Sequence, residues 1–113
     1  MTTDTLTLDK GYIDENGDAH REVTLRAPGI MDEVEAEQQR AESRYPQSQT
    51  YEQLLLLERC IISWEQIAAP SIDHLQALNQ NDVLDLMRAV NDLREKDSQQ
   101  VGNESFDSDA DSS

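Results

Sequence analysis

The chain has few residues that support covalent or metal-based chemistry. Its 113 residues include one cysteine, Cys60, and two histidines, His20 and His74. A single cysteine excludes an intramolecular disulfide and a cysteine-based metal cluster, and neither histidine has a second ligand at metal-binding spacing. The four glycines are scattered and form no phosphate-binding loop. These absences predict no catalytic residues, no metal site and no cofactor, so we do not expect an enzyme.

Positive charge is also scarce. Nine Lys and Arg residues stand against 24 Asp and Glu residues, which gives a formal net charge of −15 at pH 7. A nucleic-acid-binding protein needs basic side chains that displace counterions, and an anionic membrane surface attracts basic rather than acidic segments. We therefore expect no nucleic acid and no membrane as partners, and favour a basic or apolar protein partner. The alternative is that the charge only keeps the protein soluble.

Long apolar runs are missing as well. The longest, Leu54–Leu57, is far shorter than the roughly 20 residues of a transmembrane helix. The first residues, Met1–Thr5, lack the basic and apolar regions of a signal peptide. These features predict a cytoplasmic protein.

Residues 5–27 have the pattern of a β-hairpin. Leu6 and Leu8 alternate with threonines, which is the period of a strand, and Asn16-Gly17 is typical of a two-residue type I′ turn. Pairing about this turn sets Leu8 opposite Leu25. One face of the hairpin then carries four apolar side chains and needs cover from a helix. These four are Leu6, Leu8, Val23 and Leu25.

The hairpin tip carries oxygen ligands at alternate positions, Asp14, Asn16 and Asp18, as at the start of a calcium-binding loop. An EF-hand loop also needs Gly at its sixth position and Glu at its twelfth, which here are Ala19 and Leu25. A polar hairpin tip is therefore favoured over a calcium site.

Four helices are predicted after the hairpin, over residues 31–44, 50–69, 71–79 and 82–95. The first is rich in good helix formers but has a thin apolar face, made of Ile30, Met31, Val34 and Ala41. The second has a wide apolar stripe at helical spacing and ends at Pro70. That stripe comprises Leu54, Leu57, Ile61, Trp64 and Ala68, broadened by Leu55 and Ile62.

The predicted fold class is α+β, with the hairpin packed on three or four helices in one domain, residues 1–96. Residues 97–113 are dominated by Ser and Asp, carry five of the fifteen excess negative charges and contain no Lys or Arg. This composition predicts a disordered acidic C-terminal tail.

The order of motifs over residues 5–95 resembles the tail assembly chaperones of phages with contractile tails, of the Mu-like and P2-like kind. A strand and a glycine-containing turn lead to V-T-L-R-A-P at residues 23–28, followed by a charged helix. Then come Y-E-Q-L-L-L-L at 51–57, a helix around Trp64, and D-V-L-D-L-M-R at 82–88. The acidic segment 31–50 and the acidic tail have no counterpart in that pattern.

The resemblance implies a role without catalysis. Such chaperones bind and solubilise the long, aggregation-prone tape measure protein in the bacterial host cytoplasm, until tail tube protein polymerises around it. They are absent from the mature virion, and many have a longer, frameshifted form. Contacts with tail tube protein and homo-oligomers are compatible with this role. Our candidate contact residues are Leu55, Ile62 and Trp64, then Met87 and Val90. For Trp64, a role in the core is the favoured interpretation.

Two alternatives of another class remain. An acidic inhibitor that mimics DNA would suit the net charge of −15, and the carboxylates of the 31–44 helix would form one short array. A structural adaptor would instead stay in the finished virion.

Overall fold

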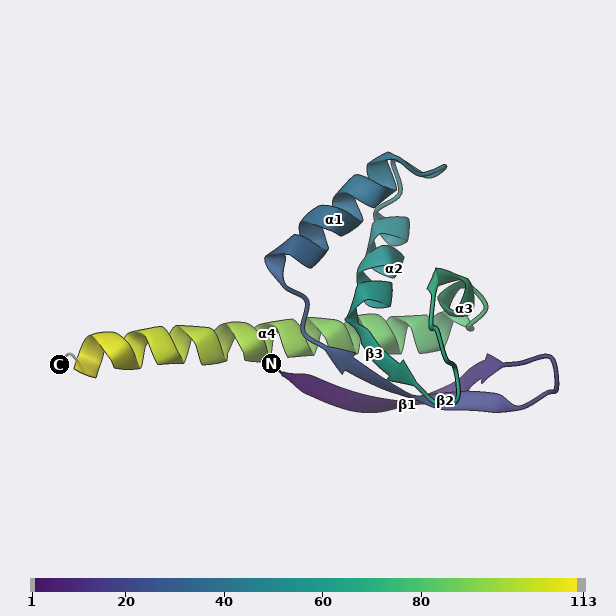
Figure 1. The fold of residues 1–113 in the computed structure, drawn as a ribbon, viewed down its shortest axis with the longest axis horizontal. Coiled ribbons are helices and arrows are strands. Elements are labelled where there is room, and N and C mark those ends of the chain that lie inside the picture. Colours follow the sequence, from purple (N-terminus) through teal and green to yellow (C-terminus); the bar gives the residue numbers. More distant parts are fainter. Residues whose placement is uncertain (1, 112–113) are drawn as a thin grey trace.

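The computed structural model describes the backbone of residues 2–111 and the side chains of residues 2–97. It confirms the α+β fold class (Figure 1), with an antiparallel sheet of strand order β1-β2-β3. Helix α4 lies along the sheet, and α1 and α2 form an antiparallel pair that projects away from it. The elements are β1 Thr3–Ile13, β2 Ala19–Arg26, α1 Ile30–Ala41, α2 Gln49–Cys60, β3 Ile61–Trp64, α3 Ile72–Gln76 and α4 Gln80–Asp111.

The hairpin of β1 and β2 lies where the sequence predicts it, but the predicted pairing of Leu8 with Leu25 is wrong. Leu25 faces Asp4 instead. The register shifts because β1 bulges between Thr7 and Tyr12, and such a bulge adds residues to one strand only. The four apolar side chains predicted to share a face nevertheless pack into one core.

The predicted two-residue type I′ turn is also wrong. The loop between the strands spans residues 14–18, and within it Gly17 alone has a positive φ, of 86°, whereas a type I′ turn needs two. The carboxylate of Asp14 explains the difference, because it accepts hydrogen bonds from the N–H groups of Asn16 and Asp18. A side chain therefore organises the tip in place of a second left-handed residue.

The helix predicted over 50–69 is the largest error in the sequence prediction. α2 ends at Cys60, and residues 61–64 form the edge strand β3, in which Ile61 faces Leu25 and Trp64 faces Val23 of β2. The β-branched and aromatic side chains of this segment favour a strand, and β2 offers it an open edge. A short apolar run fits both periods, so tertiary pairing decided the outcome.

The other helix boundaries differ by smaller amounts. α2 begins at Gln49, and the side chain of Ser48 caps it by accepting the N–H of Tyr51. α1 ends at Ala41 instead of residue 44, and α3 is shorter than the predicted 71–79. α4 begins at Gln80 and continues beyond the predicted 82–95. Of the tail predicted to be disordered, 97–113, the structure describes the side chain of Asp97 and the backbone as far as Asp111, and the rest lies outside the described residues.

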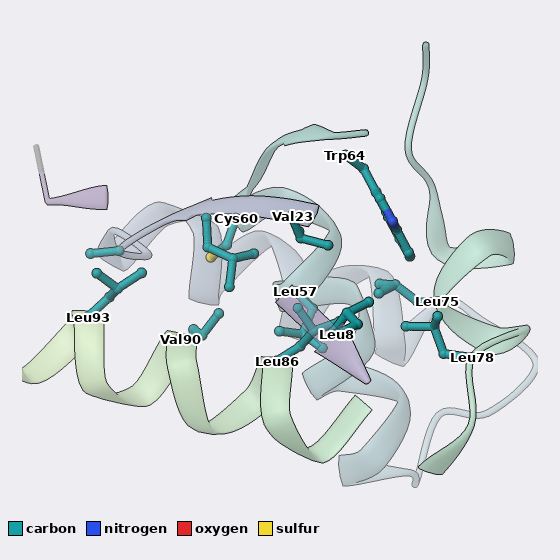
Figure 2. Close-up of a cluster of buried hydrophobic side chains, with 12 residues drawn as sticks. Leu8, Val23, Leu57, Cys60, Trp64, Leu75, Leu78, Leu86, Val90 and Leu93 are labelled. Atoms are coloured by element: carbon teal, nitrogen blue, oxygen red, sulfur yellow. The ribbon is translucent and has the colours of Figure 1, made fainter. Parts of the chain in front are cut away.

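One hydrophobic core joins the sheet to the helices (Figure 2). α4 contributes Leu86, Val90 and Leu93, α2 contributes Leu57, and the indole of Trp64 closes the end near α3. The remaining members are Leu8, Val23, Leu25, Ala27, Cys60, Leu75 and Leu78.

A fully buried carboxylate, which the sequence did not predict, fixes the start of α4 to the bulge of β1. Asp82 accepts three backbone N–H groups: from Asp9 at 3.0 Å, from Lys10 at 3.2 Å and from Gly11 at 2.9 Å. Gly11 has a φ of +76°, and a Cβ there would lie 2.5 Å from the carbonyl oxygen of His20. The bulge therefore needs both the glycine and the buried anion.

Candidate partner-binding surface

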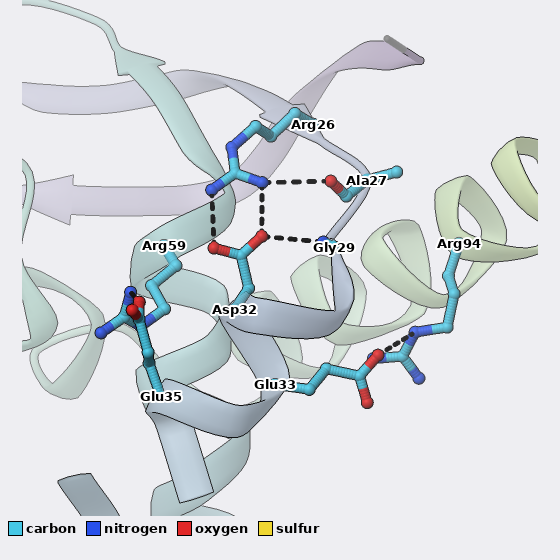
Figure 3. Close-up of polar contacts among 8 residues, drawn as sticks. All are labelled: Arg26, Ala27, Gly29, Asp32, Glu33, Glu35, Arg59 and Arg94. Carbon is cyan, nitrogen blue, oxygen red and sulfur yellow. Dashed lines mark hydrogen bonds and ion pairs between the residues drawn. The ribbon is translucent and has the colours of Figure 1, made fainter. Parts of the chain in front are cut away.

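The arginine of the V-T-L-R-A-P motif fixes helix α1 to the sheet. Arg26 donates two hydrogen bonds to the carboxylate of Asp32, at 2.7 and 3.0 Å, and Asp32 also accepts the N–H of Gly29 at 2.8 Å (Figure 3). The hydrogen bonds from Arg26 are the main reason that the pKa of Asp32 lies below its usual value. The motif thus joins the end of β2 to the first turn of α1.

Polar side chains also form much of the contact between α1 and α2. Arg59 on α2 donates to Glu35 at 2.5 Å and to Gln39 at 3.1 Å. At the other end of the pair, Arg40 donates to Glu52 at 2.7 Å. The face that α1 turns toward the protein is therefore largely polar.

Two small apolar contributions accompany these ion pairs. Ala36 is the buried residue of α1, one turn from Arg40. Leu55 on α2 is also buried, and it lies one turn from both Glu52 and Arg59, the residues paired with α1. We conclude that α1 covers Leu55, which is not part of the main hydrophobic cluster.

As a result, α1 carries its apolar side chains on the outside. Ile30 is 74% exposed, Met31 59% and Val34 46%. We call these three residues the α1 strip. An amphipathic surface helix normally turns its apolar face to the core, so α1 is reversed with respect to that rule.

A groove runs between α1, α2 and α4, made of two adjoining hollows that share Gln53, Leu56 and Arg94. Their volumes, about 80 and 160 Å³, are small beside the roughly 300 Å³ or more of a typical small-molecule pocket. The first is completed by Leu57, Met87, Val90 and Asn91, and the second by Glu33, Ala36, Gln49 and Glu52. The groove thus suits side chains of another protein better than a free metabolite.

One ion pair spans this groove. Arg94 on α4 lies 3.6 Å from the carboxylate of Glu33 on α1, beyond hydrogen-bonding distance (Figure 3). Exposed ion pairs of this kind contribute about 0.2–1 kcal/mol. The two walls are therefore only weakly linked at this point.

The structure brings together two of the five predicted contact residues. Met87 and Val90 both line the groove, although Val90 is largely buried. Leu55 and Trp64 are buried in the protein's own packing, whereas Ile62, on β3, is 50% exposed. The three contact residues expected on the stripe of the 50–69 helix are therefore divided between the interior and the sheet surface. The two expected on the last helix line the groove.

Leu56 is a groove residue that the sequence analysis did not select. Its signal was present in the four-leucine run Leu54–Leu57. Four consecutive residues point in all directions around a helix, so the side chain of at least one leucine in that run must point away from the core.

The hairpin tip forms a separate polar cluster around His20. Its Nε2 lies 2.8 Å from the Asp14 carboxylate and its Nδ1 lies 2.7 Å from the carbonyl oxygen of Glu65. The hydrogen bond to Asp14 is the main cause that raises the pKa of His20 and lowers the pKa of Asp14. Both partners accept hydrogen bonds, so the site favours the imidazolium form.

Stability should therefore depend on pH through His20. Because folding raises this pKa, the stabilisation is complete below about pH 6.5, the unfolded value, and is lost as pH rises through the higher folded-state value. The lowered pKa of Asp14 acts oppositely: its contribution is lost as pH falls below about 3.8 through the folded-state value. Urea unfolding of the wild type from about pH 5.5 to 9 should show the first loss.

The matched variants for this prediction are His20→Gln and His74→Gln. The first should abolish the loss of stability between neutral and alkaline pH, whereas the second should retain it, because it leaves the contacts of His20 in place. Equal pH dependence in His20→Gln and wild type would contradict the assignment.

The buried thiol of Cys60 lies in the core cluster. Desolvation raises its pKa to about 11. Since the thiolate is the reactive form, this side chain is placed for packing rather than for nucleophilic attack.

Comparison with known proteins gives no relative. No protein-family model, no curated protein and no solved structure matches the chain. Among the residues that the structure describes, no group of three or more His, Cys, Asp or Glu side chains is arranged to hold a metal ion. Within the same residues, no helix has the length and apolar character needed to cross a membrane.

Proposed function

We propose that this protein is a phage tail assembly chaperone, which binds and solubilises the tape measure protein before the tail tube polymerises. It acts in the bacterial host cytoplasm and is absent from the mature virion. The observation that carries the proposal is the groove, where Leu56, Met87 and Val90 from two helices line the apolar part of a partly open hollow. Its polar part is lined by Gln53, Asn91 and Arg94. Such a groove would receive the side chains of a partner helix, as in other helix-in-groove interfaces.

The charge of the chain supports the same role. A tape measure protein is long, helical and apolar along one side, so a free copy aggregates. A bound protein with a net charge of −15 would cover apolar surface and make the coated chains repel one another. Ten of these excess negative charges lie in residues 1–96, so most of the repulsion does not depend on the tail.

The DNA-mimic alternative is weakened by the pairing of carboxylates on α1. A mimic presents free carboxylates at phosphate-like spacing, but Asp32 and Glu35 each form an ion pair with an arginine of this chain, and Glu33 lies near a third. The acidic array is thus largely used within the fold.

Co-expression with the tape measure protein of the same phage tests the proposal. We expect the wild type to keep that protein in the soluble fraction and to co-purify with it. The Leu56→Gln/Met87→Gln variant should bind at least about tenfold more weakly, because two groove contacts then bury amides in place of apolar groups.

The matched control is Leu84→Gln, which changes a 45% exposed leucine on α4 outside the groove. It should solubilise the tape measure protein as well as the wild type does. Thermal unfolding by circular dichroism would verify that all variants fold. The proposal would be contradicted if the tape measure protein stayed insoluble beside abundant wild-type protein, or if purified virions contained copies of this chain.

A further inference from the structure

The reversed orientation of α1 leaves an apolar surface that the proposed groove does not use. The α1 strip occupies positions i, i+1 and i+4 of one helix, and its most exposed member, Ile30, is 74% accessible. Side chains one turn apart are neighbours on a helix, so Ile30 and Val34 form a continuous ridge with Met31 beside them.

The helix cannot rotate to bury this ridge without losing its attachment. Three ion pairs hold the opposite side of α1. They are Arg26–Asp32, Arg59–Glu35 and Arg40–Glu52. Rotation would break these ion pairs at both ends of the helix. The strip is therefore a stable feature of the folded surface.

Charge around the strip selects the kind of partner. Three of the four carboxylates of Ile30–Ala41 lie against arginines of this chain. The fourth, Glu37, lies one turn beyond Val34 on the same side and is exposed. A second copy would oppose this acidic helix with another and would itself carry a charge of −15. An anionic membrane would be repelled for the same reason.

We propose that the α1 strip is a docking surface for an amphipathic helix of another protein, whose aliphatic stripe is flanked by Lys or Arg. The aliphatic stripe would cover Ile30, Met31 and Val34, and the basic flanks would face Glu37 and the net negative charge of the chain. This proposal concerns a surface separate from the groove and holds whichever protein supplies the helix.

A pair of designed peptides tests it. Both have about 18 residues with the same leucine stripe; one carries Lys at the flanking positions and the other Glu. Fluorescence anisotropy should detect binding of the Lys peptide to the wild type, weakened by salt, and no binding of the Glu peptide.

Protein variants then separate docking from general attraction to an acidic surface. Ile30→Ser/Met31→Ser/Val34→Ser keeps every charge and should weaken the Lys peptide at least about tenfold. The control Ile13→Ser/Leu84→Ser changes residues that are 54% and 45% exposed elsewhere, and should bind within about twofold of wild type. Since all these side chains are exposed, both variants should melt close to the wild type.

Equal binding by the strip variant, or equal binding of the Glu peptide, would overturn the proposal. A wild-type dimer in sedimentation that the strip variant abolishes would overturn it in favour of a second copy. These outcomes are distinct from those of the groove, because the strip variant keeps Leu56 and Met87 and the groove variant keeps the strip.

Discussion

Replacing Asp82 with alanine is expected to lower the free energy of unfolding by about 3–5 kcal/mol. The carboxylate is fully buried and accepts three backbone N–H groups of the β1 bulge. Without it, the buried N–H of Gly11 and the part-buried N–H groups of Asp9 and Lys10 lose their acceptor. A buried donor left without an acceptor costs about 1–3 kcal/mol. A small domain has only about 5–15 kcal/mol in total, so much of the variant should be unfolded at elevated temperature.

Urea unfolding followed by circular dichroism measures this loss, and two variants sharpen it. Asp82→Asn keeps one acceptor oxygen and should lose less stability than Asp82→Ala. Asp85→Ala removes an exposed carboxylate one turn further along α4, whose partner is Arg88, and should change stability by less than about 0.5 kcal/mol. Equal stabilities of the alanine variants at 82 and 85 would show that the bulge does not depend on the buried anion.

Replacing Trp64 with alanine should cost about 3–5 kcal/mol. The indole is 2% exposed, belongs to the core cluster, and donates its Nε1–H to the carbonyl oxygen of His20 at 2.9 Å. The substitution therefore creates a cavity and also leaves a buried carbonyl without its donor. It should disturb the pairing of β3 with β2, because Trp64 faces Val23 across that pair.

Trp64→Phe separates the two contributions, since it keeps an aromatic ring and removes the donor. We expect this variant to lose about 1–2 kcal/mol, between wild type and Trp64→Ala. The matched surface control on the same strand is Ile62→Ala, at a side chain that is 50% exposed. If Trp64→Ala unfolded at the same urea concentration as Ile62→Ala, the indole would not be a core residue.

The sequence predicted the elements whose signals are local. Asn16-Gly17 marked the hairpin, and the alternating leucines marked its apolar face. The fold class followed from these signals and from the helical spacing of the later residues. None of these inferences needed a contact between distant parts of the chain.

The errors arise where distant contacts decide the structure. The bulge that shifts the hairpin register is hydrogen-bonded to Asp82, which is about seventy residues away along the chain. The strand β3 depends on the open edge of β2. Periodicity could not distinguish a helix that continues through Ile61 from one that ends at Cys60, because the apolar stripe has the same spacing in both cases.

The candidate surface could be predicted only in part, because contacts between distant segments also decide which apolar side chains stay exposed. Met87 and Val90 lie one turn apart on a helix that the sequence predicted, and both line the groove. Leu55 and Trp64 were selected from the wide apolar stripe of the predicted 50–69 helix, but α1 covers the first and β3 carries the second into the core. The outward orientation of Ile30 depends on three ion pairs of α1, and their geometry is not visible in composition or spacing.

The contact between Asp82 and β1 also bears on how copies of this protein behave when crowded. β1 is an outer strand of the sheet, and outer strands with free N–H groups act as templates for intermolecular strand addition and fibril growth. In the bulged stretch the N–H groups of Asp9, Lys10 and Gly11 are already committed to a carboxylate. An incoming strand would first have to displace a buried anion, so the molecule is protected there against becoming an aggregate itself.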